Sequence, residues 1–160
     1  MRDTRREIDA LDRRLLRALR DEPRATLVEL AELVGASRPT VKSRIDRLWD
    51  SGIIIGRETQ LDLASMGFAV QALVHLQVQQ GELAQVREHL AAMPEVIEAF
   101  STTGDADVQC RVVARSTKDL QDVLLRVSSC TAVTRTRSAV ILDSLVSHRK
   151  VQALDLLDDL

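Results

Sequence analysis

The sequence predicts an α+β chain in two parts, a helical N-terminal domain and an antiparallel C-terminal sheet with two helices on one face. Up to about residue 50, apolar residues recur three and four positions apart, which is the period of an amphipathic helix. From residue 68 they alternate with polar residues, which is the period of a half-buried strand. With 160 residues and a hydrophobic fraction of 45 %, the chain can build two small packed cores.

The N-terminal domain begins with a helix that we expect to pack behind the two helices that follow it. Its apolar residues keep helical spacing until Pro23 interrupts the pattern. They are Ile8, Leu11, Leu15 and Leu19.

A second and a third helix are joined by a short turn. Thr26 and Glu29 have the spacing of a capping box at a helix start, and Gly35 can end that helix in the left-handed conformation. Ser37 is a suitable N-cap for the third helix, whose first turn tolerates Pro39. Two short helices with a turn of about three residues between them are the arrangement of a DNA-reading helix-turn-helix.

The third helix is apolar on one side and polar on the other. Val41, Ile45 and Leu48 share the inner stripe. Arginine can pair with guanine, and lysine and hydroxyl groups can contact phosphates. An ordinary solvated helix face would carry similar charges, but the cap, the turn and the partner helix favour DNA binding. The outward residues are Arg38, Thr40, Lys42, Ser43, Asp46 and Arg47.

Residues 53–63, IIIGRETQLDL, are rich in β-forming residues and are interrupted by Gly56. This pattern predicts the two short strands of a wing. We therefore expect a winged helix-turn-helix over residues 1–62, followed by a linker over residues 63–67.

The C-terminal domain, residues 68–150, repeats one strand-helix-strand unit. Its β-α-β-β-α-β order predicts a ferredoxin-like, ACT-like sheet with both helices on one face. The other face is apolar enough that we expect two copies to pack sheet to sheet as a homodimer. A tail, residues 151–160, follows. Strands are predicted at residues 68–78, 96–103, 107–114 and 133–146, and helical stripes at residues 83–93 and 120–127.

Charge and cysteine content limit the function further. Residues 1–60 hold 13 Lys and Arg against 11 Asp and Glu, whereas residues 61–160 hold 9 against 13, so attraction for phosphate lies in the N-terminal part. Cys110 and Cys130 match no metal or redox spacing. No stretch has the apolar character of a signal peptide or a membrane span. We expect a cytoplasmic protein with reduced thiols, without a membrane partner, a metal or a cofactor.

Over nearly its whole length the chain resembles the leucine-responsive regulatory protein (Lrp/AsnC) family, also called feast/famine regulators. The resemblance implies a transcription regulator that binds double-stranded DNA and senses a small molecule, an amino acid, with its C-terminal domain. It also implies dimers that assemble further, to tetramers or octamers, with pockets where dimers meet. It rests on IDALDRRLLRAL, VKSRIDRL followed by GIIIG, LDLASMGF, TTGDADV and VTRTRSAVIL.

The resemblance places the reading helix at residues 37–49. Arg44 is the position most typical of the family motif. It is either a phosphate anchor or a structural partner to an acid in the same domain, and the sequence leaves both open. The implied DNA-binding residues are Ser37, Arg38, Pro39, Thr40, Lys42, Ser43, Arg44 and Arg47.

The resemblance also implies an effector site in the loop before the third strand and at the start of the last strand. Carboxylates and hydroxyls there can bind an α-ammonium, and loop amides around a glycine can bind a carboxylate. The alternative is a glycine turn that its aspartates merely cap. The implied effector residues are Thr102, Thr103, Gly104, Asp105, Asp107, Thr136 and Ser138.

The chain departs from the family pattern at four positions. Trp49 replaces an acid at the end of the reading helix, and Arg57 replaces an aromatic residue in the wing. Ala106 replaces an aromatic residue in the effector loop, and Ala132 replaces a glycine before the last strand. The two departures in the C-terminal domain predict a pocket that is either shaped differently or unoccupied.

Two other functions remain open. An architectural protein that bends or wraps DNA without a ligand would use the same helices. An enzyme similar to the sirohaem decarboxylases would share the fold but not the DNA contacts. The basic third helix argues against the enzyme, and so does the wide separation of His75, His89 and His148 along the chain.

Overall fold

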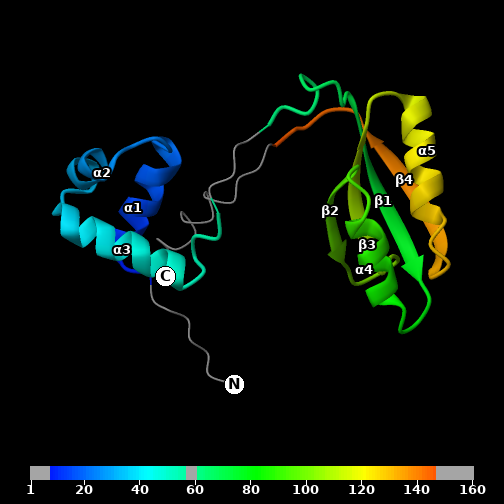
Figure 1. The fold of residues 1–160 in the computed structure, drawn as a ribbon, viewed down its shortest axis with the longest axis horizontal. Coiled ribbons are helices and arrows are strands. Elements are labelled where there is room, and N and C mark those ends of the chain that lie inside the picture. Colours follow the sequence, from blue (N-terminus) through cyan, green and yellow to red (C-terminus); the bar gives the residue numbers. More distant parts are fainter. Residues whose placement is uncertain (1–7, 57–60, 147–160) are drawn as a thin grey trace. The chain divides into compact units, whose positions relative to one another are not determined.

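The computed structural model describes residues 8–56 and 61–146. Contacts divide these residues into a helical unit, residues 8–56, and an α/β unit, residues 61–145. The two units are shown in Figure 1. The predicted contribution of Arg57 to a wing and the predicted tail at residues 151–160 lie outside the described residues.

The fold class predicted from the sequence is confirmed, with three helices in the first unit and a β-α-β-β-α-β order in the second. The helices are α1 (Ala10–Asp21), α2 (Leu27–Val34), α3 (Arg38–Asp50), α4 (Leu83–Ala91) and α5 (Thr117–Ser128). The strands are β1 (Val70–Val78), β2 (Val96–Ser101), β3 (Val108–Ala114) and β4 (Val133–Ile141).

Hydrogen bonds at the helix ends fix the turn between α2 and α3. The backbone N–H of Thr26 donates to the Glu29 carboxylate at 2.7 Å, which completes the predicted capping box. Gly35 has a φ of 64° and lets the amide of Ala36 turn back to the carbonyl of Ala31 at 3.0 Å. The Ser37 hydroxyl then accepts the amide of Thr40 in the first turn of α3. The turn geometry therefore follows from local residues alone.

The core of the helical unit holds these three helices together. It consists of apolar side chains from the inner stripes of α1, α2 and α3, so that α3 is fixed by its inner face and presents the other face to solvent. The largest fully buried members are Leu15, Leu30, Val41 and Leu48.

The predicted wing strands are absent from the described part of that segment, residues 53–56 and 61–63. Gly52 adopts a φ of 72°, and the amides of Ile53 and Ile54 both donate to the carbonyl of Leu48. These bonds complete the C-terminal cap of α3, so the two isoleucines cannot use the same amides in a strand ladder.

The sheet has the strand order β2-β3-β1-β4, and every neighbouring pair is antiparallel. In the central pairing, Val74 of β1 lies opposite Cys110 of β3 and Ser138 of β4. Opposite residues in an antiparallel pair share one face of the sheet. This register therefore decides which side chains face the helices.

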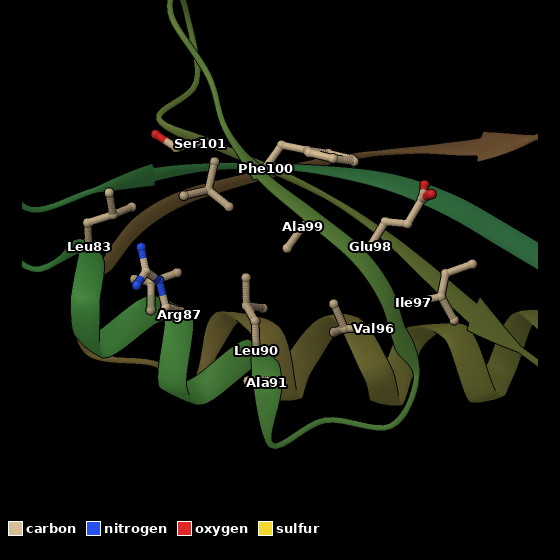
Figure 2. A pocket seen from close by; sticks show the side chains of 12 residues that line it. Leu83, Arg87, Leu90, Ala91, Val96, Ile97, Glu98, Ala99, Phe100 and Ser101 are labelled. Atoms are coloured by element: carbon tan, nitrogen blue, oxygen red, sulfur yellow. The ribbon is translucent and has the colours of Figure 1, made fainter. Parts of the chain in front are cut away.

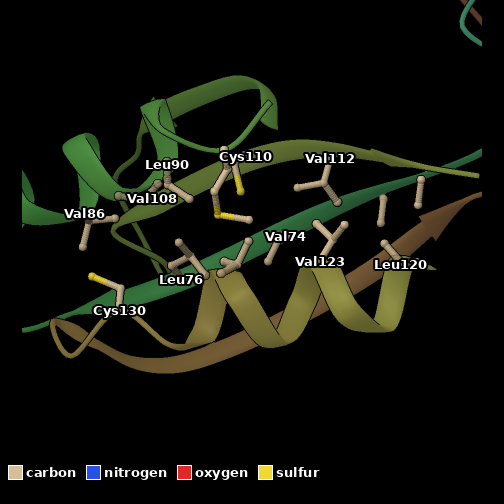
Figure 3. Packing of buried hydrophobic residues seen from close by; sticks show 14 of the residues in the cluster. Val74, Leu76, Val86, Leu90, Val108, Cys110, Val112, Leu120, Val123 and Cys130 are labelled. Atoms are coloured by element: carbon tan, nitrogen blue, oxygen red, sulfur yellow. The ribbon is translucent and has the colours of Figure 1, made fainter. Parts of the chain in front are cut away.

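Helices α4 and α5 cover the face that carries Val74. Their apolar stripes and the buried residues of β1 and β3 form one continuous core, which Figure 3 shows. Val74, Cys110 and Val123 have no exposed surface. Cys110 and Cys130 are free and buried, and burial raises the pKa of the Cys110 thiol to about 11.

Four predicted strand ends differ from the structure, and the smallest difference is at the third strand, which begins at Val108 rather than at residue 107. The last strand ends at Ile141 rather than at residue 146, because Ile141 pairs with Gln71 and β1 offers one further residue at most. The first strand begins at Val70 rather than at residue 68. The second strand ends at Ser101, since the amide of Thr102 turns to the carbonyl of Asp107 at 2.9 Å and starts a loop.

We predict that Gly35→Ala destabilises the helical unit by about 1–2 kcal/mol, because an alanine in the left-handed region brings its Cβ against the following carbonyl. Nothing lies within 4 Å of the added Cβ, so backbone strain is the sole cost. Trp49, the one tryptophan of the chain, lies in α3, so its fluorescence during urea unfolding measures this unit. The control is Glu32→Ala at an exposed position of α2; equal effects of both substitutions would contradict the prediction.

Candidate nucleic-acid interface and effector site

The outer face of α3 presents the residues that the sequence predicts for DNA contact. Arg38, Thr40, Lys42, Ser43 and Arg47 are exposed, together with Ser37 and Pro39 at the helix start, whereas Arg44 is half-buried. These positions follow from the inner stripe of α3, which is buried in the core.

The N-terminal end of α3 is a suitable site for a phosphate. The Ser37 hydroxyl lies 2.8 Å from the Thr40 hydroxyl and accepts the Thr40 amide at 3.3 Å. Arg38 makes no ion pair within the described residues. Free amides and the helix dipole favour an anion at a helix start. Arg38 therefore adds an available positive charge at the place where the backbone already attracts phosphate.

Lys42 is paired only weakly. Its ammonium donates to the Asp46 carboxylate at 2.7 Å, one helical turn away. Both side chains are more than half exposed, at 64 % and 56 %. Exposed pairs of this kind contribute little to stability and are screened by salt. A DNA phosphate can therefore compete with Asp46 for this lysine.

Arg44 and Arg47 belong to a cluster that joins α3 to the start of α1. We call Asp9, Asp12, Arg44 and Arg47 the acid–arginine cluster. Arg44 donates to Asp9 and, at 3.2 Å, to Asp12, while Arg47 donates to the other oxygen of Asp12. Asp12 is fully buried. Of the two interpretations of Arg44, the contacts favour the partner to an acid.

The cluster also caps α1. The Asp9 carboxylate accepts the amide of Asp12 at 2.9 Å, and the Asp12 carboxylate accepts the amide of Asp9 at 3.1 Å. The hydrogen bond from Arg44, supported by the Asp12 amide, lowers the pKa of Asp9 from 3.8 to about 2. Because the folded-state pKa is depressed, this stabilisation is present above about pH 4 and is lost as the pH falls toward 2.

The predicted effector loop is fastened to β1 by Asp107. The Asp107 carboxylate accepts the amide of Val78 at 2.8 Å, and the Asp107 amide donates to the carbonyl of Leu76 at 3.0 Å. The Thr102 hydroxyl closes the loop on the carbonyl of Ala106 at 2.7 Å. Gly104, with a φ of 109°, occupies a backbone conformation that other residues rarely adopt. Asp107 thus holds the loop in place.

The backbone amides at the tip of this loop are free. Within the described residues, the amides of residues 103–106 donate to no protein acceptor. Side-chain oxygens of the described residues do not cap them either. Such a run of free amides is suited to a carboxylate.

A surface hollow of about 550 Å³ adjoins this loop. It brings together four predicted effector residues, Thr102, Thr103, Asp105 and Ser138, whereas Gly104, Asp107 and Thr136 do not line it. The remaining lining residues are His75, Ala106, Gln109, Arg137 and Ala139.

The register places Thr136 and Ser138 differently from the rest of the predicted effector set. Ser138 lies opposite Val74, and Thr136 opposite Leu76, so their side chains belong to the helix-covered face. Accordingly, the Thr136 hydroxyl lies 3.2 Å from that of Ser128 in α5. The intervening Arg137 points to the other face.

Sequence reasoning missed His75, Gln109 and Arg137 as residues of the hollow. Gln109 lies opposite His75, and His75 lies opposite Arg137, which forms one row across β3, β1 and β4. The alternation of β1 identified the face of His75. The residues of β4 around Arg137 are all polar, TRTRS, so alternation gave no signal there.

A second groove, of about 330 Å³, lies between α4 and β2 and is shown in Figure 2. Its lining is largely aliphatic, including Leu83, Leu90, Val96 and Ala99. None of its lining residues belongs to the predicted effector set. We therefore place the candidate site at the loop.

Two classes of site are absent from the described part of the chain. No group of three or more His, Cys, Asp or Glu side chains there could hold a metal ion. None of the helices in residues 8–56 and 61–146 is long and apolar enough to cross a membrane.

Comparisons with known proteins match both units. Residues 8–55 match a family model described as winged helix-turn-helix DNA-binding, and residues 71–151 match the Lrp/AsnC ligand binding domain. The HTH-type transcriptional regulator Rv2324 of Mycobacterium tuberculosis is 35 % identical over 143 residues, which cover 88 % of this chain and 96 % of that protein. The matched models and relatives describe DNA-binding regulators rather than enzymes.

Solved structures give the same result. Escherichia coli AsnC superposes with a TM-score of 0.85 at 26 % identity, covering 91 % of this chain and 99 % of that one. The feast or famine regulatory protein Rv3291c of M. tuberculosis, complexed with L-methionine, superposes with a TM-score of 0.82 at 31 % identity. That match covers 90 % of this chain and 98 % of the other.

We predict that Asp12→Asn destabilises the helical unit by about 3 kcal/mol, because removing one partner from a buried ion pair leaves the other charges uncompensated. Urea unfolding followed by Trp49 fluorescence measures the change. Asp46→Asn is the matched control, since it breaks the exposed pair with Lys42 and should cost less than about 1 kcal/mol. A loss at Asp12 no greater than at Asp46 would show that the cluster does not hold the helices together.

Proposed function

The chain belongs to the Lrp/AsnC family of helix-turn-helix transcription regulators, and from this premise we propose which of its residues bind DNA and which bind an effector. The protein is a DNA-binding regulator whose activity a ligand modulates. We propose that the N-terminal end of α3 contacts DNA and that the loop at residues 102–107 receives an amino acid. The observation that carries the proposal is the available charge of Arg38 at the start of α3.

The proposed DNA contacts fall into two groups. Arg38, Thr40, Lys42 and Ser43 contact bases and phosphates directly, supported by the helix start at Ser37 and Pro39. Arg44 and Arg47 serve chiefly to position α3, since their guanidinium groups already donate to Asp9 and Asp12. The reading helix is thus held at its C-terminal half and free to contact DNA at its N-terminal half.

The proposed effector site uses two features of the loop. The Asp105 carboxylate binds the α-ammonium of an amino acid, and the free amides of residues 103–106 bind its carboxylate. Thr102 and Thr103 add hydroxyl groups. The relative from M. tuberculosis recorded with L-methionine supports an amino acid as the class of ligand.

We also propose that the protein is a homodimer that assembles further, and that it acts in the cytoplasm. A dimer presents two reading helices to a symmetric operator. The sheet face opposite α4 and α5 is the proposed dimer surface. Its half-buried residues Leu73 and His75 would become buried against the second copy of the chain. Light scattering of the purified protein tests the assembly.

We predict that Arg38→Ala weakens binding to the DNA upstream of the protein's own gene about tenfold or more, because a base-contacting arginine contributes roughly 1–3 kcal/mol. Fluorescence anisotropy at several salt concentrations measures the affinity. Loss of a phosphate contact would in addition flatten the log-log salt slope by about one unit. Arg87→Ala, in α4, carries the same change of charge and is the control; an effect equal to that of Arg38→Ala would reduce the role of Arg38 to net charge.

We predict that Asp105→Ala leaves DNA affinity unchanged without ligand and abolishes the response to amino acids. The experiment adds each common amino acid in turn at fixed salt. Asp122→Ala, at an exposed position of α5, is the control and should keep the response. Tight DNA binding that no amino acid alters in the wild type would favour the architectural alternative.

A further inference from the structure

We propose that Asp46 is a specificity-determining residue of the reading helix and that it selects a cytosine in the major groove. This inference rests on the DNA contacts proposed above for α3 and adds the base that one position reads. It follows from three observations, the place of Asp46 in one row with Arg38 and Lys42, its ion pair with Lys42 and its apolar surroundings beside α2.

Asp46 belongs to the row of side chains that the proposed function turns toward DNA. Arg38, Lys42 and Asp46 follow one another four residues apart along α3, and all three are exposed. Side chains with this spacing lie one above the other on the same face of a helix. A docking that brings Arg38 and Lys42 to DNA therefore brings the carboxylate of Asp46 to it as well.

A carboxylate on this face opposes binding unless a base compensates for it. The phosphates repel the negative charge of Asp46 on every duplex, whatever its sequence. A hydrogen-bond donor on a base edge offsets this repulsion only where the sequence provides that donor. Asp46 therefore distinguishes between sequences, whereas a phosphate contact from Lys42 attracts all of them alike.

The ion pair with Lys42 links the phosphate contact to the reading of a base. In the free protein the Lys42 ammonium donates to the Asp46 carboxylate at 2.7 Å. A DNA phosphate that takes up Lys42 removes this partner from Asp46. The removal occurs on every duplex, but the partner is replaced only on a duplex whose base donates in its stead.

The surroundings of Asp46 increase the cost of leaving its carboxylate unpaired. A hollow of about 340 Å³ between α2 and α3 is lined by Lys42 and Asp46 together with Leu27, Leu30 and Ile45. DNA that covers this face displaces water, and the apolar side chains offer no hydrogen-bond donor in its place. A charged group in such surroundings loses more free energy than a neutral polar group would.

Cytosine is the base that suits a carboxylate. Ionised Asp46 can only accept hydrogen bonds. In the major groove guanine and thymine present acceptors, and adenine presents the acceptor N7 beside its amino group. Cytosine presents its N4 amino group without a neighbouring acceptor, so it donates to Asp46 without repelling it.

The test selects duplexes from a pool with a randomised stretch, using the full-length protein and its variants. We expect the wild type to enrich cytosine at one position. Asparagine pairs bidentately with adenine, so Asp46→Asn should change the preferred base there to adenine, and Asp46→Ala should remove the preference. Trp49 fluorescence during urea unfolding establishes that each variant is folded.

Affinities measured by fluorescence anisotropy give the size of the effect. The probes are the duplex selected by the wild type and a duplex of the same composition in shuffled order. We expect Asp46→Ala to bind the shuffled duplex at least about threefold more tightly and to lower the ratio of the two affinities about tenfold. Asp50→Ala is the matched control, because it removes the same charge one turn further along, at the last residue of α3, and should change the ratio less than about twofold.

The outcomes separate this inference from the function on which it rests. If Asp46→Ala enriches the same base as the wild type, or if the wild type prefers a base other than cytosine there, the reading by Asp46 is wrong but the DNA contacts of α3 stand. An equal fall of the ratio in Asp50→Ala would assign the effect to net charge and overturn the inference as well. If Arg38→Ala also binds the selected duplex unchanged, α3 does not contact DNA and the proposed function fails together with this inference.

Discussion

The position of the reading helix depends on one buried carboxylate. Asp12 has no exposed surface, yet it accepts hydrogen bonds from two arginines of α3 and from the backbone at the start of α1. A buried charge is tolerated only when its partners compensate for lost hydration. Moving α3 away from α1 would therefore separate Asp12 from its arginine partners and leave a buried charge uncompensated, at a large electrostatic cost. The apolar core supplies most of the attraction between these helices, and the acid–arginine cluster sets the position in which they pack.

The same ion pairs divide the basic residues of α3 by function. Arg44 and Arg47 are engaged near the C-terminal half, whereas Arg38 is available at the N-terminal end. Net charge alone would not reveal this division, because all three side chains count equally toward the positive N-terminal part. In the second unit, strand register has the corresponding role. It places Arg137 beside His75 and sends Thr136 and Ser138 to the face covered by helices.

Much of the fold could be predicted from periodicity and caps. The patterns around Thr26, Gly35 and Ser37 identified the turn because its hydrogen bonds are local. The prediction of wing strands was wrong for residues 53–56 and 61–63. A high β propensity does not reveal that the cap of α3 uses the amides of Ile53 and Ile54. The loop at residues 102–107 was recognisable from its motif. Arg137 was not, because a strand segment of uniform polarity gives no sign of which residues face inward. The cluster around Asp12 joins residues more than thirty positions apart, and spacing rules describe only nearby pairs.

The buried cysteines have a practical consequence for experiments on this protein. Thiol reagents and peroxides react with the thiolate, and the raised pKa of Cys110 leaves almost none of it at neutral pH. Cys130 is also enclosed in the core of the α/β unit. Neither natural thiol is therefore accessible, and a cysteine introduced on the surface would be alkylated selectively. Distances between the two units in solution could then be measured with paired spectroscopic labels, without removing either natural cysteine.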